Sequence, residues 1–287
     1  MAVTYLITGA NGFCGSRAAQ TLARHGTVVA LSRQELDITD ADACMRMVAL
    51  HQPRYVVHTA AMADMQACEL DPYGSQAINV QGARHMAVAC RENGARLIHF
   101  STDQVYSGML QGAPHRETEP LAPTSVYGRQ KCEAEQHIAH ILPDAVVLRL
   151  TWMYDFPMRC HRTNRNILRL CQHALACGVP ITLASQTARG ITYVHEVIDN
   201  LLPISQAPGG VYNYGSAGDV TPYRLACEVL RNMQAEHRIP ELLIPMQEAP
   251  GTLADLCMDN SKATEVGACF ATTSEGMARA FREYDLL

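Results

Sequence analysis

A tyrosine and a lysine, Tyr127 and Lys131, stand four residues apart in the segment SVYGRQK. On a helix, residues with this spacing lie on one face. A phenol has an ordinary pKa of about 10, and a nearby ammonium group lowers that pKa because it favours the phenolate. Tyr127 is then suited to exchange a proton with a carbinol or carbonyl oxygen while hydride moves between the same carbon and a nicotinamide ring. The spacing alone is common by chance and elsewhere marks only an ordinary helix, so its meaning depends on its surroundings.

A third polar group follows an apolar run, where ARLIHFS (95–101) leads into STDQVYS (101–107). We expect a buried strand in the first of these segments. Ligands bind beyond the carboxyl ends of such strands in parallel sheets. Thr102 is therefore the expected hydroxyl donor to the substrate oxygen, and Thr102, Tyr127 and Lys131 form the predicted catalytic set.

Three glycines spaced G-x-x-G-x-x-G, at Gly9, Gly12 and Gly15, separate a predicted strand from a predicted helix. This context indicates a dinucleotide-binding turn rather than a plain connection. Gly9 permits the tight turn, Gly12 lets the backbone approach a pyrophosphate, and Gly15 allows close packing of the helix on the sheet. The N–H groups at the start of the helix favour phosphate. Asn11 and Phe13 belong to the same predicted cofactor site.

The end of the second predicted strand carries Ser32 and Arg33 in the sequence ALSRQ. A carboxylate at this place would bind the ribose 2′-hydroxyl of NAD, whereas an arginine pairs with a 2′-phosphate. NADP(H) is therefore favoured. NAD(H) stays an alternative because Glu35 stands two positions later, and Arg33 is otherwise a solvated surface residue. Asp37 and Ile38 are expected beside the adenine.

Apolar strands alternate with helical patterns through the first half of the chain. The expected strands are 3–8, 27–32, 54–60, 95–101 and 145–151, and the expected helices are 13–24, 41–51, 72–93 and 126–141. This alternation predicts an α/β, doubly wound parallel sheet of the Rossmann type. We expect residues 1–155 to form the NAD(P)-binding domain, with part of 186–205 returning to it, and residues 156–287 to form a smaller substrate-binding lobe.

An arginine-rich segment opens the second part of the chain. Arg162, Arg165 and Arg169 are predicted to share one helical face, where planar guanidinium groups suit a diphosphate. A solvated basic face is the alternative. Arg189 is a further candidate. His58 and His99 stand within apolar strands and are interpreted as core residues or as support for the site.

The composition restricts the class of protein. The chain has 287 residues, 48% of them hydrophobic and 18% charged, and a net charge of −5, which indicates a globular protein without a broad nucleic-acid surface. Its 11 cysteines lack C-x-x-C spacing and are expected to be reduced thiols in a cytoplasmic protein. The apolar run at 3–8 is too short for a signal peptide, and no stretch reaches membrane-spanning length. No motif predicts a metal site.

The motifs GANGFCG, STDQVYS and SVYGRQK together resemble the extended short-chain dehydrogenases/reductases, and more narrowly the dTDP-4-dehydrorhamnose reductase-like family. The segments LDITD (36–40), VVHTAAM (56–62) and RLTWMYD (149–155) add to a likeness that covers nearly the whole chain. The resemblance implies NAD(P)H-dependent reduction of a 4-keto sugar carried on a nucleotide. It implies Thr102, Tyr127 and Lys131 as the catalytic set, cofactor contacts at Thr59, Ala60, Ala61 and Asn79, and a place for Trp152 near the sugar nucleotide.

The predicted substrate-binding set is Asp103, Trp152, Arg162, Arg165 and Arg189. The chain also departs from the family pattern, because Met62 and Ala63 replace a polar pair and Gln66 replaces an acid. Two alternatives therefore stay open. One is an epimerase or dehydratase of the same superfamily, disfavoured because Gln104 stands where such enzymes use Glu. The other is a non-catalytic, dinucleotide-binding regulatory subunit. The sequence does not reveal the oligomeric state, and a homodimer is one alternative.

Overall fold

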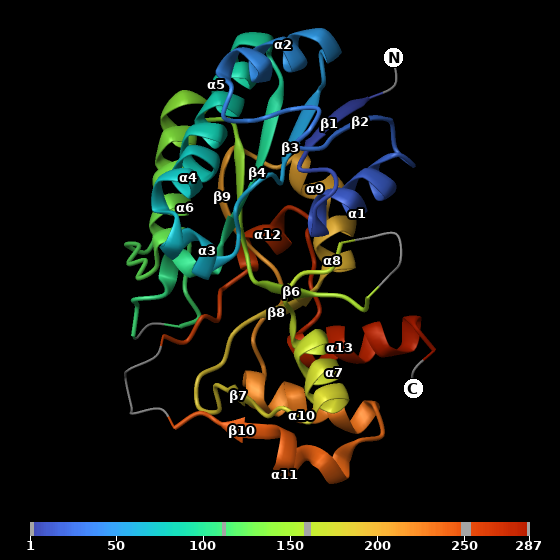
Figure 1. Cartoon of the computed structure of the whole chain (residues 1–287). Coiled ribbons are helices and arrows are strands. Elements are labelled where there is room, and N and C mark those ends of the chain that lie inside the picture. Colours follow the sequence, from blue (N-terminus) through green and yellow to red (C-terminus); the bar gives the residue numbers. More distant parts are fainter. Residues whose placement is uncertain (1–2, 111–112, 158–161, 248–253, 286–287) are drawn as a thin grey trace.

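A six-stranded parallel sheet forms the centre of the protein (Figure 1). The computed structural model describes residues 3–110, 113–157, 162–247 and 254–285. In spatial order the strands are β2 (Thr27–Leu31), β1 (Thr4–Thr8), β3 (Tyr55–His58), β4 (Arg96–Thr102), β5 (Val146–Leu150) and β9 (Gly210–Tyr214). Because β2 and β3 lie on opposite sides of β1, the chain changes direction there, and ligands of such sheets bind at the carboxyl ends of the strands at this point. The predicted doubly wound α/β fold is confirmed.

The strands are buried on both faces, which explains their continuous apolar sequences. Tyr5 and Ile7 of β1 pack into one hydrophobic cluster, whereas Leu6 packs into the opposite one. In β4, Ile98 packs into the same cluster as Tyr5 and Ile7, and Leu97 packs into the same cluster as Leu6. This alternation follows from the two-residue period of a strand.

Helices cover each face of the sheet, and Figure 1 shows the two layers. One layer contains α2 (Ala41–His51), α5 (Ala83–Asn93) and α6 (Val126–Ile141), and the other contains α1 (Phe13–Leu22), α8 (Val194–Asp199), α9 (Leu201–Ser205) and α12 (Ser261–Glu265). Side-chain caps fix where two of these helices begin, because Asp40 accepts from the Ala43 N–H and Ser125 from the Gly128 N–H.

The segment predicted as one helix over 72–93 is divided in the structure. A short helix, α3 (Met65–Leu70), precedes it, and α4 (Pro72–Gln76) is followed by a π-helical segment, η1 (Ala77–Gly82), and then by α5. Asp71 ends α3 and caps α4, where Pro72 occupies the first turn. Single π turns often mark functional sites, and this one carries Asn79.

A second lobe lies at the carboxyl edge of the sheet (Figure 1). It contains α7 (Ile167–Cys177), α10 (Pro222–Asn232), η3 (Glu236–Arg238), α11 (Ile239–Leu242), α13 (Thr273–Glu283) and the parallel pair β7 (Ile181–Leu183) and β10 (Leu243–Pro245). A second parallel pair, β6 (Trp152–Tyr154) and β8 (Ile191–Tyr193), lies between the lobes. The residues of the second lobe share one hydrophobic cluster.

Two features differ from the expectations for residues 156–287. Gly210–Tyr214 form β9, the sixth strand of the central sheet, so the chain returns to the first lobe again beyond residues 186–205. The helix α7 begins only at Ile167, because Asn166 caps it through the Arg169 N–H. Arg162 and Arg165 therefore precede the helix, and the prediction that they share a helical face with Arg169 was wrong.

Candidate active site

The turn between β1 and α1 places the three glycines where a side chain would not fit. Gly9 has φ +68°, and a Cβ atom there would lie 2.8 Å from the Ala60 Cα. At Gly15, a Cβ atom would lie 2.3 Å from the Gly9 carbonyl oxygen. The Gly12 N–H donates to that same carbonyl (2.8 Å), which closes the turn. Because Gly12 is the N-cap of α1, no side chain caps its first N–H groups, and these suit a phosphate.

Residues at the end of β3 form the other wall of this turn. The Thr59 hydroxyl donates to the Thr8 carbonyl (2.7 Å), and the Ala60 N–H donates to the Thr8 Oγ1 (3.3 Å). Ala61 is exposed beside them. In the turn itself Asn11 is exposed, and the Arg17 guanidinium lies 4.5 Å above the Phe13 ring. The backbones of β1 and β3 therefore approach each other closely at this turn, and its role as a dinucleotide site stays a prediction.

The tip of β2 reaches the same turn, since the Ala10 N–H donates to the Leu31 carbonyl (3.1 Å). The Glu35 carboxylate accepts from the Ser32 N–H (2.8 Å), and this hydrogen bond lowers the pKa of Glu35. Arg33 is exposed at the tip. Asp37 accepts from the N–H and hydroxyl of Thr39, which lower its pKa.

Ile38 and Asn79 hold neighbouring segments rather than opening onto the turn. Ile38 is buried, and a Cβ atom at Gly82 would lie 2.6 Å from its Cδ1. The Asn79 amide accepts from the Met62 N–H (2.8 Å) and donates to the Met62 carbonyl (3.0 Å) and to Gln130 (2.9 Å). Asn79 thus positions the segment 60–66, and its expected direct contact with a cofactor stays a prediction.

Thr102 and Tyr127 meet at the carboxyl end of β4. Thr102 caps the short 3-10 helix η2 (Asp103–Tyr106), and Tyr127 lies in the first turn of α6. Burial raises the pKa of Tyr127, the negative charge of Asp103 raises it further, and a side-chain hydrogen bond with Thr102 partly opposes both. Cys14 of the glycine turn also acts on this phenol. The two hydroxyl groups are therefore adjacent and lie beside the turn.

Lys131 lies one helical turn after Tyr127 and is buried. Its ammonium group lies 3.0 Å from the His99 Nε2. Burial lowers the pKa of Lys131 to about 8, against an opposing effect of Glu135. The expectation that the pKa of Tyr127 is lowered by Lys131 is not met in this structure, because burial and the charge of Asp103 raise that pKa.

Most of the predicted substrate-binding residues form one row beyond the hydroxyl pair. The buried Asp103 carboxylate pairs with the Arg189 guanidinium at 2.5 Å. That guanidinium lies 5.4 Å above the Trp152 ring, and the Trp152 indole N–H donates to the Arg165 carbonyl at 3.0 Å. The guanidinium groups of Arg165 and Arg162 are exposed. Gln104 also donates to Asp103 (3.1 Å).

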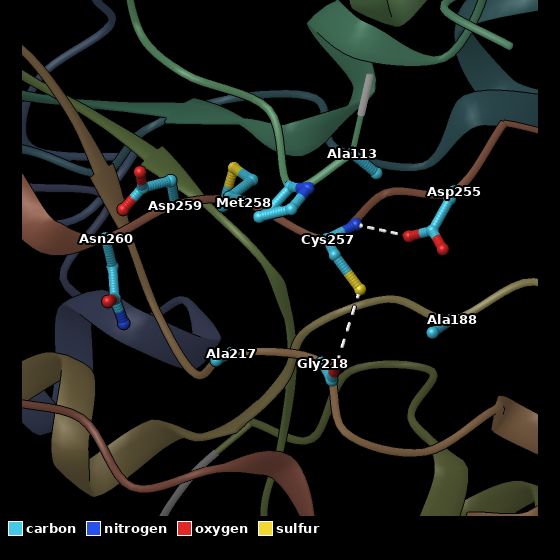
Figure 2. Close-up of a pocket in the computed structure, with 10 residues that line it drawn as sticks. Ala113, Ala188, Ala217, Gly218, Asp255, Cys257, Met258, Asp259 and Asn260 are labelled. Carbon is cyan, nitrogen blue, oxygen red and sulfur yellow. Dashed lines mark hydrogen bonds between the residues drawn. The ribbon is translucent and has the colours of Figure 1, made fainter. Parts of the chain in front are cut away.

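A cavity of about 480 Å³ adjoins the chain next to Arg189. Figure 2 shows Ala188, Gly218 and Cys257 on its wall, with the Cys257 thiol donating to the Gly218 carbonyl. Asp255, Asp259 and Asn260 add polar atoms to the lining. The sequence indicated none of these residues, because they belong to segments that are far apart in the chain and meet only in the folded protein.

The sequence also gave no sign of a buried ion pair between Arg17 and Asp155. The Arg17 guanidinium donates to the Asp155 carboxylate through two nitrogens, at 2.6 and 2.8 Å, and their side chains are 1% and 0% exposed. A charged residue in a helical pattern ordinarily indicates the solvent face, so only the apolar residues at Phe13 and Ala18 around it hinted at burial.

Three further observations concern the described residues only. No group of three or more His, Cys, Asp or Glu side chains is placed there to hold a metal ion. None of their helices combines the length and the apolar character needed to cross a membrane. The cysteines among them are free thiols.

A glycine turn at the point where the sheet changes direction, followed by Tyr127 and Lys131 on one helix and by Thr102 at the end of β4, defines a class. This is the arrangement of the NAD(P)-dependent oxidoreductases of the short-chain dehydrogenase/reductase type. The sequence profile of the RmlD substrate binding domain matches residues 3–256, and the chain belongs to that dTDP-4-dehydrorhamnose reductase-like family. The resemblance found in the motifs is confirmed.

Individual proteins agree with this assignment. The chain is 41% identical over 152 residues to a dTDP-4-dehydrorhamnose reductase of Streptomyces griseus, a match that covers 52% of this chain and 50% of that protein. It is 33% identical over 223 residues, 76% of this chain and 73% of the relative, to a probable dTDP-4,6-dihydroxy-2-methyloxan-3-one 4-ketoreductase of Streptomyces antibioticus. A dTDP-4-dehydrorhamnose reductase from Bacillus anthracis, solved in complex with NADP, superposes with a TM-score of 0.86 over 99% of both chains at 22% identity.

Proposed function

We propose that this protein reduces the keto group of a nucleotide-linked 4-keto sugar with NADPH. The observation that carries the proposal is the pair of adjacent hydroxyl groups, Thr102 and Tyr127, at the carboxyl end of β4 and beside the glycine turn. The relatives named as reductases of dTDP-linked keto sugars support the substrate class.

The coenzyme would lie across the glycine turn. Gly9 and Gly15 leave the space that a Cβ atom would fill, and the first N–H groups of α1 would bind the pyrophosphate. Arg33 would pair with the 2′-phosphate, because Glu35 is already engaged by the Ser32 N–H. When bound, NADPH supplies the hydride. NADH is the alternative coenzyme.

Tyr127 would donate the proton. In a reduction the carbonyl carbon receives hydride and its oxygen receives a proton, so the acid must be protonated beforehand. The raised pKa of Tyr127 keeps the phenol protonated at neutral pH. Thr102 would donate a hydrogen bond to the same oxygen and hold it in place, and the Lys131 ammonium would favour the phenolate that remains.

The sugar nucleotide would lie between the lobes. Trp152 offers a flat apolar surface, and the exposed guanidinium groups of Arg162 and Arg165 are available to a diphosphate. Arg189, beside Asp103, would contact the sugar end. On this proposal, residues 1–155 with part of 186–205 and with 210–214 form the lobe that binds the coenzyme, and most of the remaining later residues form the lobe that closes over the substrate.

The alternatives to a reductase place different demands on Asp103 and on Tyr127. A dehydratase needs a free acid next to the hydroxyl donor, but Asp103 is paired with Arg189 and accepts from Gln104. A regulatory subunit needs no reactive tyrosine at all. The pairing of Asp103 with Arg189 therefore favours a reductase over a dehydratase.

The test combines a substrate panel with one variant. NADPH is mixed with the protein and a set of dTDP- and GDP-linked 4-keto sugars, and its absorbance is followed. We expect turnover of at least one sugar, and Tyr127→Phe is expected to lower kcat by at least about 100-fold because the proton donor is lost. Tyr73→Phe, at a tyrosine that is 87% exposed, is the matched control.

Two outcomes would contradict the proposal. One is the lack of NADPH oxidation with every sugar tested. The other is full activity of Tyr127→Phe. Co-purification with a larger enzyme, in an assembly indifferent to Tyr127→Phe, would instead indicate a regulatory subunit.

A further inference from the structure

Three polar side chains form a row across the sheet beneath the proposed active site. Thr8 of β1 lies opposite His58 of β3, and His58 lies opposite His99 of β4. Because these positions are in register, all three side chains lie on the face covered by α6. The row ends at Lys131 of α6, whose Nζ lies 3.0 Å from the His99 Nε2.

The row is continuous and lies inside the protein. The His58 and His99 rings are stacked with centroids 5.2 Å apart, and the His58 Nδ1 lies 2.7 Å from the Thr8 Oγ1. Both histidines and Lys131 are 1% exposed. Such polar groups are costly to bury in a core, so their retention calls for a role.

The Lys131 contact fixes the hydrogen-bonding state of His99. An ammonium group has only donors, so the His99 Nε2 must accept, and the ring proton then lies on Nδ1. Burial, together with the charge of Lys131, lowers the pKa of His99 well below its ordinary value, and burial lowers the pKa of His58 to about 3. Both rings are therefore neutral throughout the neutral pH range.

We propose that His99 is a positioning residue that holds the Lys131 ammonium group in place beneath the active site and keeps it charged there. This inference rests on the proposed function, in which Lys131 favours the phenolate of Tyr127. The stacked His58, anchored to Thr8, fixes the plane of the His99 ring, so that its acceptor nitrogen faces the lysine.

The electrostatic surroundings make this acceptor necessary. The titratable groups around Lys131 are His99 of β4 and His58 of β3, whose pKa values its charge lowers, and Glu135 of α6. Glu135 raises the pKa of Lys131, but its carboxylate is already shared by Arg149 at 2.7 Å and by Ser101. Without the His99 Nε2 as an acceptor, the effect of burial on the ammonium group would be less opposed, and Lys131 would lose its proton at a lower pH.

The sign of the pH effect follows. Lys131 acts as an ammonium group, so activity falls as the pH rises through its pKa of about 8. Removing the acceptor lowers that pKa further. The basic limb of kcat/KM against pH is therefore expected to move to lower pH.

The experiment compares His99→Leu with His99→Gln, which retains an amide oxygen near the position of Nε2. In His99→Leu we expect the basic limb of kcat/KM to move down by at least about one pH unit, since a hydrogen bond to a charged group is worth that much or more. His99→Gln is expected to keep the limb close to that of the wild type, because its amide oxygen remains an acceptor for the ammonium group. NADPH binding and thermal melting of each variant establish that it folds.

The outcomes separate this inference from the proposed function. If Lys131→Met retains full activity, the proposed role of Lys131 fails. If Lys131→Met is inactive while His99→Leu leaves the basic limb in place, the role of His99 is overturned and the proposed function stands. If His99→Leu does not fold, the His99→Gln variant decides. A shift of its basic limb of kcat/KM by one pH unit would overturn the role of His99, because this variant retains an acceptor for the ammonium group.

Discussion

Two neighbouring side chains of opposite charge, Arg33 and Glu35, lie at the tip of β2, where we propose that the coenzyme ribose binds. Glu35 is engaged by its hydrogen bond to the Ser32 N–H, while Arg33 stays exposed. The same two residues made the choice between NADP and NAD ambiguous from the sequence. The hydrogen bond from the Ser32 N–H to Glu35 supports the proposal that Arg33 is the residue that contacts the ribose.

Replacing Arg33 tests this directly. Arg33→Ala is expected to raise KM for NADPH by about 10- to 100-fold, because a charge-assisted contact with the 2′-phosphate is lost. KM for NADH should stay nearly unchanged, because NADH has no 2′-phosphate. Steady-state kinetics with both coenzymes measure it. Arg46→Ala, at an exposed arginine of α2, is the control. Equal effects on both coenzymes would contradict the role of Arg33.

Among the elements, the turn from β1 to α1 depends most on the absence of side chains. Its glycines allow the Gly9 carbonyl, the Thr59 hydroxyl and the start of α1 to lie within contact distance. The helix α6 is fixed differently, by the Glu135–Arg149 ion pair that ties it to β5. Each element thus carries its part of the site on a rigid support.

A methyl group in the turn should separate coenzyme binding from general stability. Gly15→Ala would bring a Cβ atom to 2.3 Å from the Gly9 carbonyl, so the turn must open. We expect Kd for NADPH to rise at least about tenfold, measured by fluorescence titration. In Gly94→Ala, where the φ of +66° is strained but no atom lies within 4 Å, Kd should not change although the protein becomes less stable. An unaltered Kd in Gly15→Ala would argue against the turn as the coenzyme site.

In the molecule as a whole, the Arg17–Asp155 ion pair joins α1 of the first lobe to the segment that enters the second. The Tyr284 hydroxyl at the end of α13 donates to the same carboxylate (3.0 Å). Burial alone would raise the pKa of Asp155, but His195 and Arg17 outweigh it and lower that pKa. The stabilisation is therefore present above the ordinary carboxyl pKa and is lost as the pH falls through the lowered value.

Breaking this pair should destabilise the whole protein. Arg17→Met leaves the Asp155 charge buried without its main partner, and we expect the free energy of unfolding to fall by about 3–5 kcal/mol. Urea denaturation measures it, and Arg24→Ala, at an exposed arginine just after α1, should change it by less than about 0.5 kcal/mol. A loss in Arg17→Met no larger than the loss in Arg24→Ala would show that the pair is not a joint between the lobes.

Patterns local in the chain predicted most of the fold. The helices at 41–51 and 126–141 have the expected bounds, and the glycine spacing located the turn. What failed depends on contacts between distant segments. In the sequence, Gly210–Tyr214 is one of several short apolar runs, and only its pairing with β5 in the fold identifies it as a strand of the sheet. The raised pKa of Tyr127 follows from burial, and the link between His99 and Lys131 follows from register across the sheet. The two histidines within successive apolar strands were a signal for that link.

The late position of β9 in the chain also has a consequence for biosynthesis. β5 is complete at Leu150, but its outer neighbour is made some 60 residues later, at Gly210–Tyr214. Until then the growing polypeptide presents the backbone of β5 as an open edge, which favours association with other nascent chains. For the same reason we expect that truncation near residue 155 would not release an autonomous folding unit.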